Sequence, residues 1–236
     1  MKRLLFCLLF VPVLLVPYVA LASEGGYRLD TSPNDVRDLV SLQSGARTYV
    51  NYCLGCHSAQ YVRYKSLTEL GLTESQVRDN LLFTGEKVGD MMKSPVPAQA
   101  KQWFGVVPPD LSVIARSRGA DWLYTYLRTF YRDPKTATGW NNAVYPNVAM
   151  PHALWMLQGE QTYDAEKKVF AEKSKGAMSR TEYDATVRDL VNFLAWIGEP
   201  AAAERKSLGI IVLLVLALVL FPLTYWLKKE YWKDVK

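Results

Sequence analysis

The chain has 236 residues, half of which are apolar, and its 28 Lys and Arg residues against 23 Asp and Glu give a formal net charge of +5. This length suits one domain of ordinary size together with membrane segments. Much of the positive charge lies at the two ends, in Lys2, Arg3 and four lysines after residue 227. The central part is therefore close to neutral, which argues against a nucleic-acid partner.

Residues 1–22 are expected to form a secretory signal peptide. The sequence opens with a basic MKR, continues with roughly 16 apolar residues and reaches the cleavage pattern Ala20-Leu21-Ala22. Two prolines interrupt the run, and it is short for a membrane span. An uncleaved N-terminal anchor is the alternative. Cleavage after Ala22 removes Cys7 and leaves two cysteines in the mature chain.

The next predicted element is a helix that leads into those two cysteines. Pro33 suits its first turn, and the helix runs toward the sequence NYCLGCHSA, which contains Cys53, Cys56 and His57. Helical spacing is shown by the apolar residues Val36, Leu39, Val40, Ala46, Tyr49 and Val50.

Three kinds of site could use this cysteine pair. A thiol-disulfide oxidoreductase usually carries C-x-x-C where a strand feeds a helix, whereas here a helix precedes the pair. A zinc site could recruit His152, but the adjacent Cys56 and His57 do not match structural zinc spacings. C-x-x-C-H is a haem attachment signal, with two thioether bonds and an imidazole that reaches the iron. Covalent haem is the favoured interpretation.

A haem of this kind needs a sixth ligand to its iron, and the residues leave several candidates. Met150 lies in GWNNAVYPNVAMPHAL, an Asn- and Pro-rich stretch that can bend a side chain over a flat cofactor. His152 is its rival. A methionine as the sixth ligand would raise the reduction potential and close the iron to small ligands. The other candidates are Met91, Met92, Met156 and Met178.

Three further helices and one exposed segment are predicted in the same domain. Thr73 to Gln76 can cap one helix, and a capping box from Ser179 to Glu182 opens another. The charged stretch 163–176 is expected to be a solvated loop. The apolar faces are Leu123, Tyr126, Leu127 and Phe130 in one helix, and Tyr183, Val187, Leu190, Val191 and Leu194 in the last.

A membrane anchor is predicted near the C-terminus. Leu208 to Leu227 contain no charged residue, and Tyr225 and Trp226 lie where an aromatic belt is expected. Pro222 is tolerated near the end of such a span. We therefore expect an exported domain over 23–205, an anchor over 206–228 and a cytoplasmic tail over 229–236.

Several segments resemble the cytochrome c1 family, the haem-bearing anchored subunits of the quinol:cytochrome c reductase (cytochrome bc1) complex. They are YVNYCLGCHSAQYVRYKSL, VVPPDLSVIARSRG, AMP at residues 149–151, and VNFLAWIGEPAAAERKSLG before the span. The resemblance covers almost the whole mature chain in order. It implies a mainly α fold: a c-type haem domain with long loops and one C-terminal transmembrane helix.

The resemblance also implies roles for particular residues. One haem c would be attached covalently to Cys53 and Cys56, with His57 and Met150 as the axial iron ligands. His152 would then be a loop histidine near the haem. Either Arg116 or Arg118 would pair with a haem propionate, and Pro108 and Pro109 would form a rigid wall for the haem.

The function implied by the resemblance is one-electron transfer from the Rieske iron-sulfur protein to a soluble or anchored c-type cytochrome, beside a cytochrome b subunit. The chain would break no bonds itself, so enzyme activity would belong to the complex. Export and the anchor place it in a bacterial inner (plasma) membrane with the haem domain on the periplasmic side. The alternatives are an anchored cytochrome c of another respiratory complex and a thiol-disulfide oxidoreductase.

Overall fold

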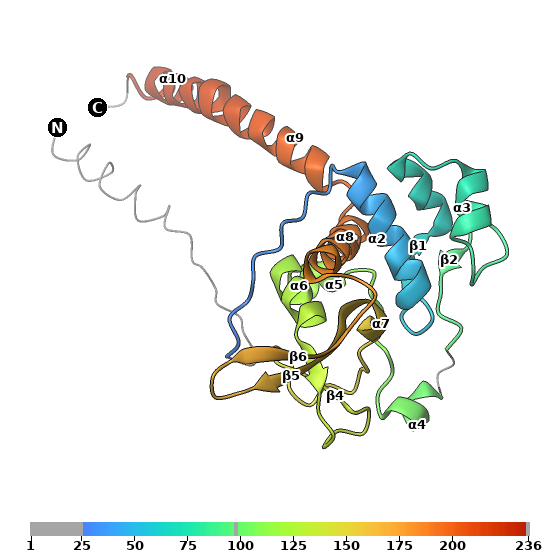
Figure 1. Ribbon diagram of the computed structural model, residues 1–236. Helices are drawn as coiled ribbons and strands as arrows, with labels where there is room; N and C mark the ends of the chain where they lie inside the picture. The colour runs from blue at the N-terminus through green and yellow to red at the C-terminus, as the bar shows by residue number, and fades with distance from the viewer. Residues whose placement is uncertain (1–25, 97–98, 235–236) are drawn as a thin grey trace.

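The computed structural model describes residues 26–96 and 99–234 (Figure 1). Helices dominate it, as predicted, and the predicted signal peptide with Cys7 lies outside the described residues. The helices of the domain are α2 (Leu39–Tyr52), α3 (Glu74–Asn80), α4 (Ala100–Phe104), α5 (Ile114–Arg118), α6 (Ala120–Arg128), α7 (Trp155–Gln158) and α8 (Arg180–Gly198), with the 3-10 helix η2 (Tyr64–Leu70). Three antiparallel pairs are formed by β1 (Ala59–Arg63) with β2 (Met91–Met92), β3 (Phe130–Arg132) with β4 (Trp140–Asn142), and β5 (Gly159–Asp164) with β6 (Val169–Lys175).

Helices α2 and α8 pack against each other at the centre of the domain (Figure 1). The side chain of Asp38 caps α2 by accepting the Ser41 amide, so the helix begins at Leu39 and not near Pro33 as predicted. A Cβ at Gly45 would lie 2.0 Å from the carbonyl oxygen of Asp189 in α8. Only glycine therefore lets the two backbones approach this closely.

The capping box predicted for α8 is confirmed. The hydroxyl of Ser179 accepts the amide of Glu182, and the Glu182 side chain accepts the amide of Ser179 in return. The predicted face of the helix is buried, and the hydroxyl of Tyr183 donates to the carbonyl of Leu127 at 2.8 Å. The box predicted from Thr73 to Gln76 is likewise present at the start of α3. Local polar signals thus fix where both helices begin.

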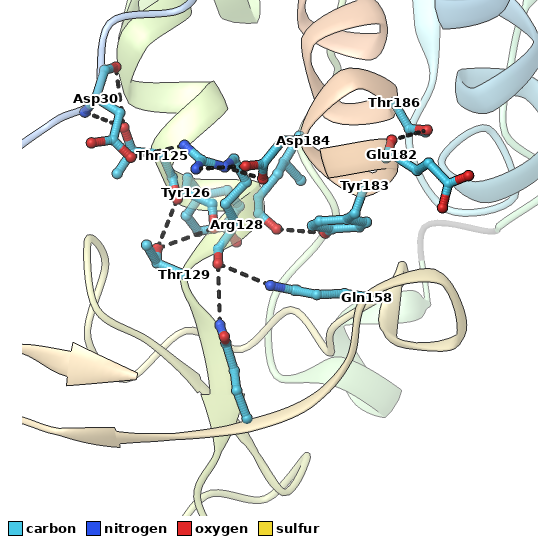
Figure 2. A network of polar contacts seen from close by, with 12 residues as sticks. Asp30, Thr125, Tyr126, Arg128, Thr129, Gln158, Glu182, Tyr183, Asp184 and Thr186 are labelled. Carbon is cyan, nitrogen blue, oxygen red and sulfur yellow. Dashed lines mark hydrogen bonds and ion pairs between the residues drawn. The ribbon is translucent and has the colours of Figure 1, made fainter. Parts of the chain in front are cut away.

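Arg128 fixes the end of α6 to three other parts of the chain (Figure 2). Its guanidinium donates to both carboxylate oxygens of Asp184 in α8, at 2.6 and 3.1 Å, and to Asp30 in the N-terminal segment at 2.8 Å. Its carbonyl accepts the side-chain amides of Gln158 and Gln161, at 3.0 and 3.1 Å. The helix ends here, so Phe130, predicted to share its apolar face, lies instead in β3.

The stretch predicted to be a solvated loop at 163–176 belongs to a hairpin of β5 and β6. Most of its side chains are exposed, which agrees with its charge, but the backbone is regular. Gly159 has a φ of +88°, and a Cβ there would lie 2.2 Å from the carbonyl oxygen of Ser174. The rings of Tyr163 and Phe170 pack across the strands, 4.7 Å apart. Cross-strand pairing gives this segment its regular backbone, and the charged composition alone did not predict that pairing.

The C-terminal segment is one apolar helix that extends away from the domain (Figure 1). It comprises α9 (Ala202–Val215), the π-helical turn η3 (Leu216–Leu220) and α10 (Phe221–Tyr231). Its mean hydropathy over the most apolar window is 2.7, and none of that window is buried against the domain. The π turn ends two residues before Pro222, whose missing N–H interrupts the regular ladder. An apolar helix without a protein covering fits a single-pass membrane anchor.

Candidate functional site

The cysteine segment forms a tight turn at the carboxyl end of α2. The Cys53 amide still donates to the carbonyl of Tyr49 at 2.9 Å, and the Cys53 carbonyl accepts the amides of Cys56 and His57 at 3.0 and 2.8 Å. Cys53 is buried, with 9% of its surface exposed, whereas Cys56 is exposed. The turn therefore buries the first cysteine in the domain and leaves the second exposed at the surface.

This setting does not favour thiolate chemistry. Burial first, and then the nearby Cys56, raise the pKa of the Cys53 thiol to about 12. Cys53 also caps the carboxyl end of a helix, where the partial charge is negative and disfavours an anion. A redox-active C-x-x-C needs a lowered pKa at its attacking cysteine, so the thiol-disulfide oxidoreductase alternative loses support.

His57 is held in one orientation and one tautomer. Its Nδ1 lies 2.8 Å from the carbonyl oxygen of Pro109, and because a carbonyl can only accept, Nδ1 carries the proton. The Nε2 lone pair is then available to a metal ion. Burial lowers the pKa of the imidazole, although Pro109 and Asp110 oppose this shift, and the ring stays neutral as a ligand must. Tyr49 fixes the backbone by donating to the His57 carbonyl at 2.8 Å.

The Pro-Pro-Asp-Leu-Ser segment is joined to the cysteine segment by hydrogen bonds. The carboxylate of Asp110 accepts the amides of Gln60 and Ser112 at 2.9 and 2.8 Å. The amide of Leu111 donates to the carbonyl of Ser58 at 2.7 Å. These bonds hold the carbonyl of residue 109 against the imidazole, so the segment orients the histidine. The resemblance had implied only a rigid wall from the two prolines of this segment.

Replacing Asp110 with alanine is expected to destabilise the domain by about 1–2 kcal/mol, because two backbone amides lose a charged acceptor. The melting temperature should fall by about 2–4 °C for each kcal/mol in a domain of this size. Thermal unfolding of the detergent-solubilised chain measures the change. Asp79→Ala is the matched control, because Asp79 is exposed and, among the residues that the structure describes, pairs only with its neighbour Arg78. Equal melting temperatures for the two variants would contradict the role given to Asp110.

Two buried asparagines shape the loop that carries Met150. The side-chain oxygen of Asn142 accepts the amides of Val144 and Tyr145 at 2.9 and 3.0 Å. The side-chain oxygen of Asn141 accepts the amide of Asn147 at 2.8 Å, and Asn147 adopts a left-handed φ of 61°. Side-chain hydrogen bonds thus replace the missing secondary structure of this loop.

Met150 is half-buried against the core, and its sulfur has a polar partner. The hydroxyl of Tyr126 donates to the Met150 Sδ at 3.4 Å. Burial raises the pKa of Tyr126, with Tyr145 as the second cause, so the hydroxyl remains a donor. Among the rival methionines, Met156 is 62% exposed and Met92 is fully buried in β2.

His152 is a core residue, with only 2% of its surface exposed. Its ring lies parallel to that of Phe130 at 4.9 Å and meets the edge of Trp140 at 5.0 Å. Burial lowers its pKa to about 4, although the neighbouring Gln158 opposes the shift. Within the described part of the chain, its Nε2 has no hydrogen-bond partner. His152 is therefore neutral, packed between aromatic rings and two residues from Met150.

The two arginines predicted to meet a propionate have different surroundings. Arg116 forms an ion pair with Glu199, which also binds Arg205 at the start of the C-terminal helix. Arg118 lies 5.2 Å above the ring of Trp122. The indole N–H of Trp122 is buried and has no acceptor among residues 26–96 and 99–234. A cation beside a buried, unsatisfied donor fits a carboxylate supplied by a bound group.

These residues fit a c-type haem. They provide two thiols for attachment, an imidazole with a free Nε2, a thioether and a donor pair for a carboxylate. Among the described residues, no three His, Cys, Asp or Glu side chains gather into a cluster that could hold a metal ion, so the zinc alternative has no support in this part of the chain.

Comparisons with known proteins agree with this chemistry. The model of the Cytochrome C1 family matches residues 31–235. The chain is 47% identical to a cytochrome c1 of Allochromatium vinosum, over 94% of this chain and 96% of that protein. It is 50% identical to a Nitrosomonas europaea protein named ammonia monooxygenase gamma subunit, over 96% and 97%. A cytochrome c1 of Rhodospirillum rubrum is 30% identical over 95% and 94%.

Proposed function

Because the chain belongs to the cytochrome c1 family, whose members are haem-binding proteins of respiratory electron transport, we propose that it is the electron-transferring haem subunit of a quinol:cytochrome c reductase. The observation that carries this proposal is the C-x-x-C-H turn, in which His57 donates Nδ1–H to Pro109 and keeps Nε2 free. A dithiol enzyme has no use for such a fixed imidazole.

Each residue of the site has a stated task in this proposal. Cys53 and Cys56 would hold one haem covalently, and His57 and Met150 would supply the two protein ligands to its iron. The haem, when bound, supplies the one-electron chemistry by exchanging ferrous and ferric iron. Arg118 is the better candidate for a propionate, because it lies beside the buried indole N–H of Trp122, which could donate to the same carboxylate.

The proposed path of the electron runs from the Rieske iron-sulfur protein to a soluble or anchored c-type cytochrome. The anchor over 206–228 docks the chain beside cytochrome b in a bacterial inner membrane. The exported domain, 23–205, then lies on the periplasmic side and the tail, 229–236, in the cytoplasm. An apolar helix of 30 residues that is not buried against the domain supports this arrangement.

Affinity purification after gentle solubilisation tests the assignment to this complex. We expect the tagged full-length chain to bring down cytochrome b and the Rieske protein with a c-type haem spectrum. Recovery of the haem protein without those two subunits would contradict the assignment to this complex, but the assignment as a c-type cytochrome would stand. Recovery with the subunits of a membrane monooxygenase would favour the kind of complex that the name of the Nitrosomonas relative suggests.

A further inference from the structure

Tyr126 and Met150 form a contact whose chemistry goes beyond packing. The phenol hydroxyl donates to the thioether sulfur at 3.4 Å. A thioether sulfur has two lone pairs, so it can bind iron with one and accept a hydrogen bond with the other. The hydrogen bond seen in the structure is therefore compatible with the iron bond proposed above.

The same tyrosine also holds the loop of Met150 at a second point. The side-chain amide of Asn142 donates to the backbone carbonyl of Tyr126 at 2.8 Å. Thr129 donates to that carbonyl as well, at 3.3 Å (Figure 2). Tyr126 thus contacts both ends of the segment from Asn142 to Met150, through its backbone at one end and its hydroxyl at the other.

The tyrosine cannot easily move away from the sulfur. Only 8% of its surface is exposed. Its ring stacks on Trp122 at 4.7 Å with an angle of 12° between the planes, and meets Phe130 edge-on at 5.0 Å. In such a water-poor setting a hydrogen bond is stronger than in solvent, and its donor is held in place.

We propose that Tyr126 is a positioning residue for Met150 and raises the reduction potential of the site. The inference rests on the proposed function, in which the Met150 sulfur binds haem iron. The hydroxyl orients the thioether and withdraws electron density from the sulfur. A weaker sulfur donor stabilises ferric iron less than before, so the equilibrium shifts toward the ferrous state.

Replacing Tyr126 with phenylalanine tests the proposal, because it removes only the hydroxyl. We expect the equilibrium constant for reduction of the haem, measured by redox titration of the purified complex, to fall about fivefold, as loss of one hydrogen bond implies. The red absorption band of iron bound to methionine sulfur should remain. Tyr124→Phe is the matched control: Tyr124 is equally buried in α6, but its hydroxyl makes no hydrogen bond with the described residues.

The outcomes separate this inference from the function on which it rests. Absence of the methionine band in the unaltered protein would overturn the ligand assignment. Presence of the band with an unchanged potential in Tyr126→Phe would overturn the positioning role alone. Should Tyr126→Phe fail to take up haem, the iron–sulfur vibration of the unaltered protein can be compared in H2O and D2O. A shift supports a hydroxyl on the sulfur, and an identical frequency contradicts it.

Discussion

Replacement of both Cys53 and Cys56 with alanine is expected to abolish covalent haem attachment. The two thioether bonds are the only covalent links proposed between the chain and its cofactor, and backbone hydrogen bonds in the turn at the end of α2 hold both cysteines and His57 together. Peroxidase staining of the chain after denaturing electrophoresis measures the effect, and the stained band should disappear.

Cys7→Ala provides a matched control for the cysteine variants. Cys7 belongs to the predicted signal peptide, so its loss should leave the stained band unchanged. Single replacements should each leave one link and a weaker band. A double variant that still carries haem after denaturation would contradict covalent attachment at these positions.

Replacement of Met150 with leucine is expected to have the second-largest effect. Leucine keeps the volume but cannot bind iron, so the red methionine band of the oxidised protein should vanish. The reduction potential should fall by an amount on the order of 0.2 V, a part of the roughly 0.8 V over which axial ligands set haem potentials. An absorption spectrum and a redox titration of the purified complex measure both changes.

Two further variants sharpen this test. Met156→Leu alters a methionine that is 62% exposed on α7, and it should leave the band and the potential unchanged. His152→Phe removes the rival ligand from a pocket already lined by Phe130 and Trp140. Absence of the methionine band from the unaltered protein, together with a changed haem spectrum in His152→Phe but not in Met150→Leu, would transfer the sixth position to His152.

The parts of the fold that could be predicted are those set by local chemistry. Ser179 with Glu182 fixes the start of α8 through hydrogen bonds that span three residues. The C-x-x-C-H turn is equally local, because its bonds link residues 53 to 57. The absence of charge from Leu208 to Leu227 is also visible directly in the sequence.

The parts that could not be predicted depend on contacts between distant segments. Pro109 orients His57 from 52 residues away, and Tyr126 reaches Met150 from 24 residues away. Some signal was present, since Asp110 bonds the amide two residues later in an Asx turn, which its sequence context permits. The contact between the carbonyl of residue 109 and the imidazole of His57, however, can be seen only in the folded chain.

Strand pairing was missed for a related reason. The charged stretch from 163 to 176 has the composition of a solvated loop, and its side chains are largely exposed. The backbone nevertheless pairs from Gly159 with Lys175 to Asp164 with Val169. Two-stranded hairpins depend on their turn and on packing to the rest of the domain more than on an alternating pattern.

Reduction of the haem by quinol in the purified complex tests the central claim most directly. A quinol is added without oxygen and the c-type absorption band of this chain is followed in time. We expect the haem to be reduced within the turnover time of the complex and reoxidised when a ferric c-type cytochrome is added. A band that stays oxidised while the complex turns over quinol would contradict the proposed electron transfer through this chain.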